Sequence, residues 1–205
     1  MAAKKLNLVF RQGETFLRII RWETTPFVYK AITAITKAAP VAITAIGHGL
    51  KTGWRVAVVS VQGMTEINAL NDPPRDNELK QVTVVDDDTV TLNRVNSSDF
   101  TTYVGPSGYL QFYTPVDLTG YEAHMMIKDR VGGTVLAELT SDGVDNRIVI
   151  DAVNNTITIT VAADDTAAFT FSSGTYDIEM VSPTGAVTTI YYGSVSVTKE
   201  VTTTT

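Results

Sequence analysis

The sequence contains no cysteine among its 205 residues. This absence excludes disulfides, thiolate metal sites and cysteine nucleophiles, and it is compatible with assembly in a reducing cytosol. Long apolar runs are also missing, since none approaches the roughly 18–20 residues that a membrane-spanning helix needs. The segment after Lys4 and Lys5 is too short and too alternating for a secretory signal. We therefore expect no membrane insertion.

Histidine is scarce, because His48 and His124 are the only two imidazole groups in the chain. His48 lies in a glycine-flanked turn, and His124 alternates with apolar residues, which places it on the outward face of a strand. Two histidines so far apart in sequence do not form the clustered pattern of a metal site. We therefore expect no catalytic residue, no metal site and no cofactor.

The remaining acidic and aromatic candidates favour structural roles over chemistry. The Asp86–Asp88 run lacks the spaced ligands of a calcium loop, and Asp164 with Asp165 suits a helix start better than a metal pair. Trp22 and Trp54 have apolar neighbours, which favours core packing over sugar stacking. A carboxylate pair for glycoside cleavage could converge in space, but nothing in the sequence selects one.

The net charge is −6 and is unevenly distributed. Residues 1–29 hold five Lys/Arg against two Asp/Glu, whereas residues 115–205 hold four against twelve. An acidic chain lacks the positive field of a nucleic-acid-binding protein, so no nucleic-acid partner is expected. We expect Arg11, Arg18 and Arg21 to lie beside acidic C-terminal strands. Lys4 and Lys5 are expected to be solvated, or else to reach an acidic partner.

Apolar and polar residues alternate with period two through most of the chain, for example over residues 121–128, 156–161 and 176–180. This pattern predicts antiparallel strands with one buried face. Turn residues punctuate the strands, and only residues 162–169 favour a helix. The sequence therefore predicts an all-β fold of the sandwich or barrel type.

The order of the predicted strands indicates that one β-domain is inserted into another. Those at residues 6–11 and 15–23 are expected to continue only near residue 114, after a stretch with its own strands and apolar faces. We therefore predict a discontinuous sandwich of residues 1–29 plus 115–201, an inserted barrel of residues 30–114, and a flexible tail of residues 202–205. The insert contains a long loop around Pro73 and Pro74, and loops of this length are often functional.

Several segments in the outer pieces resemble the immunoglobulin-like N-terminal domain of phage baseplate upper proteins. They are residues 10–15, 116–121, 131–136, 174–179 and 193–197, with the alanine-rich helix between them. The insert resembles a barrel module of phage virion proteins, itself similar to the first catalytic-cysteine half-domain of ubiquitin-activating enzymes. That likeness rests on residues 35–40, 48–53 and 61–68, and residues 70–78 depart from it with a longer, double-proline loop.

The resemblance implies an immunoglobulin-like β-sandwich interrupted by a small β-barrel. It further implies a structural component of a tailed bacteriophage virion, in the tail, collar or baseplate region, and not an enzyme. Its expected partners are other virion proteins, in a homo-oligomeric ring assembled in the host cytoplasm. The alternative is a host-surface module that binds carbohydrate or a receptor, suggested by Phe100, Tyr103, Tyr109 and the Pro73-Pro74 loop. A cell-wall hydrolase is a third and weaker possibility.

Overall fold

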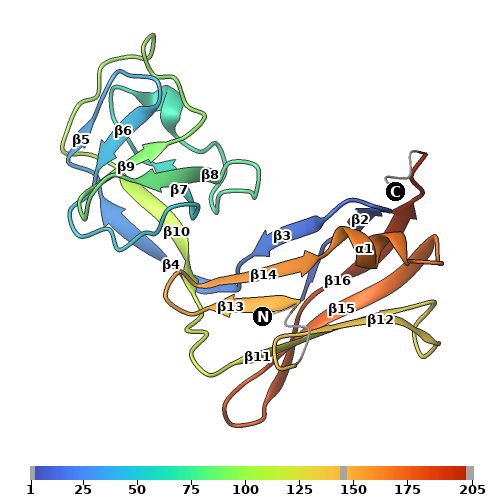
Figure 1. Ribbon diagram of the computed structural model, residues 1–205. Coiled ribbons are helices and arrows are strands. Elements are labelled where there is room, and N and C mark those ends of the chain that lie inside the picture. The colour runs from blue at the N-terminus through green and yellow to red at the C-terminus, as the bar shows by residue number, and fades with distance from the viewer. Residues whose placement is uncertain (1–2, 144–146, 202–205) are drawn as a thin grey trace. The chain divides into compact units, whose positions relative to one another are not determined.

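The computed structural model describes residues 3–143 and 147–201, and the protein is all-β (Figure 1). The chain forms two compact units, residues 1–22 with 115–205 and residues 23–114. The first crossing between them follows Trp22, seven residues before the predicted boundary at 29. The predicted tail at 202–205 lies outside the described residues. No helix in the described part of the chain is long and apolar enough to cross a membrane.

The discontinuous unit contains a six-stranded sheet. Its strand order is β1-β16-β15-β11-β12, with β2 also pairing with β16. The six strands are β1 (Lys4–Lys5), β2 (Leu8–Arg11), β11 (Glu122–Lys128), β12 (Val135–Thr140), β15 (Ser173–Val181) and β16 (Val187–Thr198).

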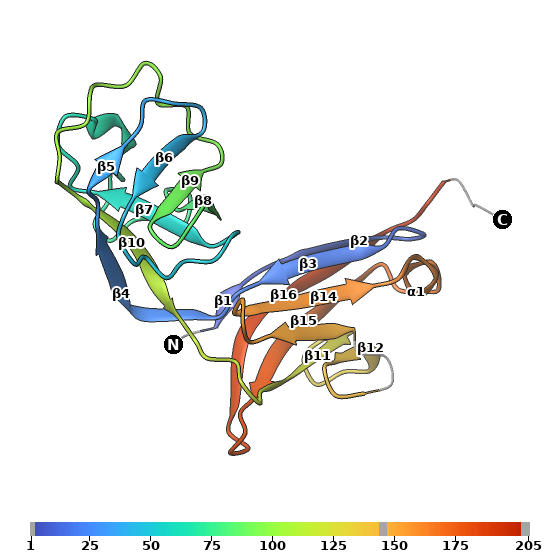
Figure 2. The same cartoon turned by 60° about the vertical axis from the view of Figure 1, so that its left-hand side comes forward.

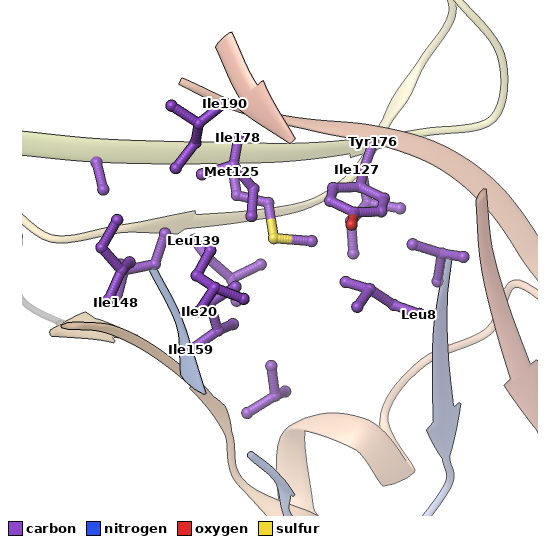
Figure 3. Packing of buried hydrophobic residues seen from close by; sticks show 14 of the residues in the cluster. Leu8, Ile20, Met125, Ile127, Leu139, Ile148, Ile159, Tyr176, Ile178 and Ile190 are labelled. Atoms are coloured by element: carbon purple, nitrogen blue, oxygen red, sulfur yellow. The ribbon is translucent and has the colours of Figure 1, made fainter. Parts of the chain in front are cut away.

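A smaller three-stranded sheet faces the first (Figure 2). It has the order β13-β14-β3, with β13 at Ile148–Asp151, β14 at Thr156–Val161 and β3 at Phe16–Ile20. Alternate residues of each strand enter one core between the sheets, as Figure 3 shows for Leu8, Ile20, Met125, Ile159 and Ile178. Strands from residues 3–22 therefore contribute to the same apolar interior as strands from residues 115–201.

The N-terminal strands pair in parallel with β16, although alternation predicted antiparallel strands. Lys4 and Lys5 pair with Tyr191 and Tyr192, and β2 pairs with residues 195–198 further along. The backbone of Lys4 and Lys5 extends a sheet, while Lys5 is exposed to solvent as expected and Lys4 is half-buried. Arg11 and Arg18 do lie on strands beside C-terminal strands, but their register partners are Thr198 and Ile159, not acids.

One short helix closes an end of the sandwich. It is α1 (Ala163–Ala167), and Asp164 and Asp165 lie in its first turn. The Thr166 hydroxyl lies within hydrogen-bond distance of the carbonyl oxygens of Glu14 (2.9 Å) and Ala163 (2.8 Å), which share its single proton. Asp165 also accepts a bond from Arg147 at 3.0 Å. Both aspartates thus belong to a helix start, and Asp165 has a structural partner.

The inserted unit is a seven-stranded sheet that curls into a half-barrel, with the order β4-β10-β7-β8-β9-β6-β5. Residues such as Ile43, Val56, Val82 and Leu110 fill its own core. The strands are β4 (Glu23–Ala31), β5 (Ala34–Ile35), β6 (Val41–Thr44), β7 (Arg55–Val59), β8 (Lys80–Val84), β9 (Thr89–Leu92) and β10 (Tyr109–Pro115), with a 3-10 turn, η1, at Thr65–Ile67.

Candidate functional site

The outer face of the three-stranded sheet carries an exposed apolar row. Leu17 and Ile19 on β3 are 60% and 55% exposed, and Val149 on β13 is 54% exposed. Register places Ile19 opposite Thr158, and Thr158 opposite Val149. Methyl groups of threonine therefore continue the apolar surface between the two edge strands. We name Leu17, Ile19 and Val149 the apolar row.

The insert carries exposed aromatic residues on the outer faces of β4 and β10. Tyr29 and Tyr109 are 53% and 45% exposed and lie edge to face, with ring centroids 6.1 Å apart. Phe27 and Tyr113 are half-buried and form a second pair, with ring centroids 4.5 Å apart. Burial, helped by the charges of Asp76 and Glu23, raises the pKa of Tyr113. We name these four residues the aromatic face.

A buried amide lies on the same face of β10. Gln111 alternates with Tyr109 and Tyr113, is buried, and is paired in register with Ala57 of β7. Its Nε2 atom has no hydrogen-bond partner among the described residues. An unsatisfied buried donor costs on the order of 1–3 kcal/mol, so this surface holds an unused polar group between Tyr109 and Tyr113 along β10.

Two of the three aromatic residues expected at a binding surface are structural instead. Phe100 and Tyr103 pack against the core of the insert. The Tyr103 hydroxyl also donates to the carbonyl oxygen of Ile32 at 2.9 Å and accepts from the amide of Ser107 at 2.9 Å. Only Tyr109 is exposed as expected. Its partner Tyr29 was missed because it lies in a strand assigned to the other unit.

Hydrogen bonds within the Pro73-Pro74 loop stabilise its conformation. Glu78 accepts hydrogen bonds from the amides of Leu70 (2.6 Å) and Arg75 (2.8 Å) and from the side chain of Asn71 (3.0 Å). These bonds to backbone and side-chain donors lower the pKa of the Glu78 carboxyl, with the Arg75 amide contributing most. Pro74 is buried while Pro73 is exposed. The loop therefore presents a fixed surface.

His48 is a structural turn residue. It is buried, its Nδ1 accepts from the amide of Leu50 at 2.9 Å, and its Nε2 lies 3.1 Å from the carbonyl oxygen of Asp86. Asp86 and Asp88 accept the backbone amides of Asp88 and Gly47. These hydrogen bonds thus connect the turn at residues 47–50 to the turn at residues 86–88. Trp54 is buried in the insert core, and Trp22 packs edge to face on Tyr121 in the other unit.

His124 does have acidic neighbours, which the sequence did not suggest. Glu122, His124 and Asp142 form the one group of three or more potential metal ligands in the described ranges 3–143 and 147–201, with ligand atoms all within 4.8 Å. His124 Nε2 is 3.7 Å from Asp142 Oδ1. Counting register outward from the turn at residues 130–133 would pair Glu122 with Ser141, and only the register shift between Ile127 and Lys128 brings Asp142 to this face.

Comparison with known proteins adds no family to this description. No protein-family model matches the chain, and no curated protein matches it significantly. The likeness to phage proteins therefore stays a prediction from the motifs.

Proposed function

We propose that this chain is a structural component of a tailed bacteriophage virion, in the tail, collar or baseplate region. It acts there as an assembly or adaptor protein through protein–protein contacts. The motifs described above support this assignment, as does an all-β chain in which one unit interrupts another. Both units are rich in sheet edges, and edges can pair with strands of neighbouring proteins.

The observation that carries the proposal is the apolar row. Leu17, Ile19 and Val149 are each more than half exposed, and burying a side chain of this size contributes about 1.5–3 kcal/mol. Both β3 and β13 are edge strands of their sheet in the described part of the chain. A neighbour can therefore cover the apolar row and add a strand at the same place.

The neighbour that we propose for the apolar row is a second copy of this chain, in a head-to-tail ring. A heterologous contact joins different surfaces of two copies, so it can cover the apolar row of each copy with a different surface of the next.

Sedimentation velocity over a range of chain concentrations tests this contact. We expect the natural chain to associate, and the double variant Leu17→Thr/Ile19→Thr to remain monomeric at the same concentrations. The matched control is Val131→Thr/Val187→Thr, which removes two exposed apolar side chains away from the apolar row. Association that persists in the Leu17/Ile19 variant, or a natural chain that stays monomeric throughout, contradicts the self-assembly proposal.

The virion assignment is tested separately. Mass spectrometry of purified tailed particles from the source of this sequence should detect the chain as a stoichiometric component. A reconstruction of the tail should then show the copies arranged around its axis. If the chain is absent from purified particles, the virion role is refuted, whatever the oligomeric state of the chain.

A second candidate, host-surface binding, is favoured by the aromatic face. Exposed aromatic rings stack on sugars and receptor side chains, and they lose little conformational entropy on binding. A glycan array and a host-cell binding assay test this function. We expect Tyr29→Ala/Tyr109→Ala to abolish binding, while Tyr192→Ala, which removes a tyrosine of similar exposure in the other unit, leaves it intact. Equal binding by all three proteins would exclude this surface.

A further inference from the structure

The ladder between β11 and β12 brings two carboxylates and an imidazole to one surface. His124 pairs with Thr140 in this antiparallel ladder, and the amide of Ser141 donates to the carbonyl oxygen of Ala123 at 2.9 Å. Asp142 follows two residues after β12 ends, and its carboxylate lies within 4.8 Å of ligand atoms of Glu122 and His124. Since side chains alternate between faces along a strand, Glu122 and His124 share the outer face.

The negative charges of this cluster favour binding of a cation. Carboxylate oxygens of Glu122 and Asp142 lie within 4.8 Å of each other, and like charges at this separation repel. Further acids surround them on the same outer face. Glu179 of β15 pairs with His124, and Glu138 of β12 pairs with Met126. A positive ion held between Glu122 and Asp142 would relieve the repulsion.

The backbone beneath the cluster is firmly held. Ala123 and Met125, which flank His124 on β11, are buried in the sandwich core. The amide of Ala123 also donates to Ser141 Oγ at 2.7 Å, beside the position of Asp142. Two of the three ligands therefore lie on a packed strand, and the third lies two residues after β12 ends.

We propose that Glu122, His124 and Asp142 bind a divalent transition-metal ion of the zinc class. One imidazole nitrogen and two carboxylate oxygens are a donor set that suits Zn²⁺. Ca²⁺ and Mg²⁺ favour oxygen ligands alone, so the imidazole selects against them. The ligand atoms, all within 4.8 Å of one another, must close to about 3.3 Å for bonds of about 2.0–2.1 Å.

Such a site has an open side. Three protein ligands leave at least one coordination position of Zn²⁺ for water or for a ligand from a neighbouring molecule. The site lies on an outward strand face, so a side chain of another protein can reach that position. This inference does not depend on the virion assignment.

Isothermal titration of the chelator-treated full chain with ZnCl₂ tests the site. We expect about one ion per chain. Each of the variants His124→Ala, Glu122→Gln and Asp142→Asn should weaken binding by about tenfold or more, because each removes one of three ligands. CaCl₂ and MgCl₂ should bind more weakly than ZnCl₂. Circular dichroism and thermal unfolding establish that each variant is folded.

The matched control is Glu138→Gln, which removes a charge from the same outer face without removing a ligand. It should retain the affinity of the natural chain to within about twofold. A loss of Zn²⁺ affinity equal to that of Glu122→Gln would show that the general negative charge of this face attracts the ion, and it would overturn the site. An affinity for Zn²⁺ unchanged by His124→Ala, or no saturable binding to the natural chain, would overturn it as well.

Discussion

The hydroxyl of Tyr176 donates a hydrogen bond of 2.6 Å to the carbonyl oxygen of Leu6, which lies 170 positions earlier in the chain. Tyr176 is buried in the sandwich core, as Figure 3 shows. Leu6 lies between β1 and β2, where its amide donates to the carbonyl oxygen of Tyr192 at 2.9 Å. The two ends of the discontinuous unit are therefore joined by specific polar contacts as well as by apolar packing.

Removing the Tyr176 hydroxyl should destabilise the discontinuous unit. The variant Tyr176→Phe keeps the ring but leaves the Leu6 carbonyl without this donor, so we expect the free energy of unfolding to fall by about 1–2 kcal/mol. Urea denaturation at pH 7 measures the change. Tyr192→Phe, an exposed tyrosine on the neighbouring strand, is the control and should cost little. Equal costs for the two variants would argue against the Leu6 contact.

Because Tyr176 is buried, we expect the stability of the protein to decrease in alkali. Burial raises the pKa of Tyr176 well above that of an exposed tyrosine, so the folded state retains this proton where the unfolded chain has lost it. The resulting stability is fully present below about pH 10, the ordinary tyrosine value, and is lost as the pH rises further. We expect the unfolding midpoint of the natural chain to fall more steeply above pH 10 than that of Tyr176→Phe. Parallel curves would contradict this linkage.

Gly193 permits the N-terminal segment to cross β16 closely. A Cβ atom at this position would overlap the carbonyl oxygen of Leu6, a backbone atom that cannot rotate away. We expect Gly193→Ala to cost more than about 2 kcal/mol, since two paired strands must separate. Ser194→Ala, at the next and exposed position, should cost less than about 0.5 kcal/mol. Thermal unfolding compares the two, and a neutral Gly193→Ala would show that Leu6 does not lie against β16.

Glu78 should control the order of the Pro73-Pro74 loop. The variant Glu78→Gln loses the charge that three donors recognise, and we expect faster protease cleavage within residues 69–78. Because the pKa of Glu78 is lowered on folding, its contribution is present above the ordinary value near 4.3 and is lost as the pH falls through the folded value. Hydrogen exchange of the loop should therefore accelerate in acid.

Asp87→Asn in the neighbouring turn is the control for Glu78→Gln. It removes one exposed charge from the same unit without altering the bonds to Leu70, Asn71 and Arg75, so cleavage within residues 69–78 should proceed at the natural rate. Equal acceleration by both variants would point to general charge loss as the cause.

Local pattern was enough to predict most strands. The alternation at residues 156–161 corresponds to β14, and the acidic start at residues 164–165 to α1. The parallel pairing of β1 and β2 with β16 was not predicted, because alternation reports which face is buried and not the direction of the neighbour. The boundary after Trp22 was missed because extended, β-forming residues continue from β3 into β4 without a turn signal.

The candidate surfaces depend on pairing between distant residues. Tyr29 meets Tyr109, and Glu122 meets Asp142, only once the strand register is known. His124 was correctly expected on an outward face, but its acidic neighbours were not. Exposure of the apolar row was hidden for a different reason, since Leu17 and Ile19 resemble core residues in sequence but lie on the outer face of their sheet.

Hydrogen exchange of the full chain carrying Leu8→Ala tests the central claim that residues 3–22 and 115–201 share one core. Leu8 is buried between the sheets, and its truncation should cost about 2–5 kcal/mol. The account predicts weaker protection of β11, β15 and β16, more than a hundred residues away, with β6 to β9 unchanged. Ile43→Ala should do the reverse, weakening the insert alone. Loss of protection confined to residues 3–22 after Leu8→Ala would contradict the shared core.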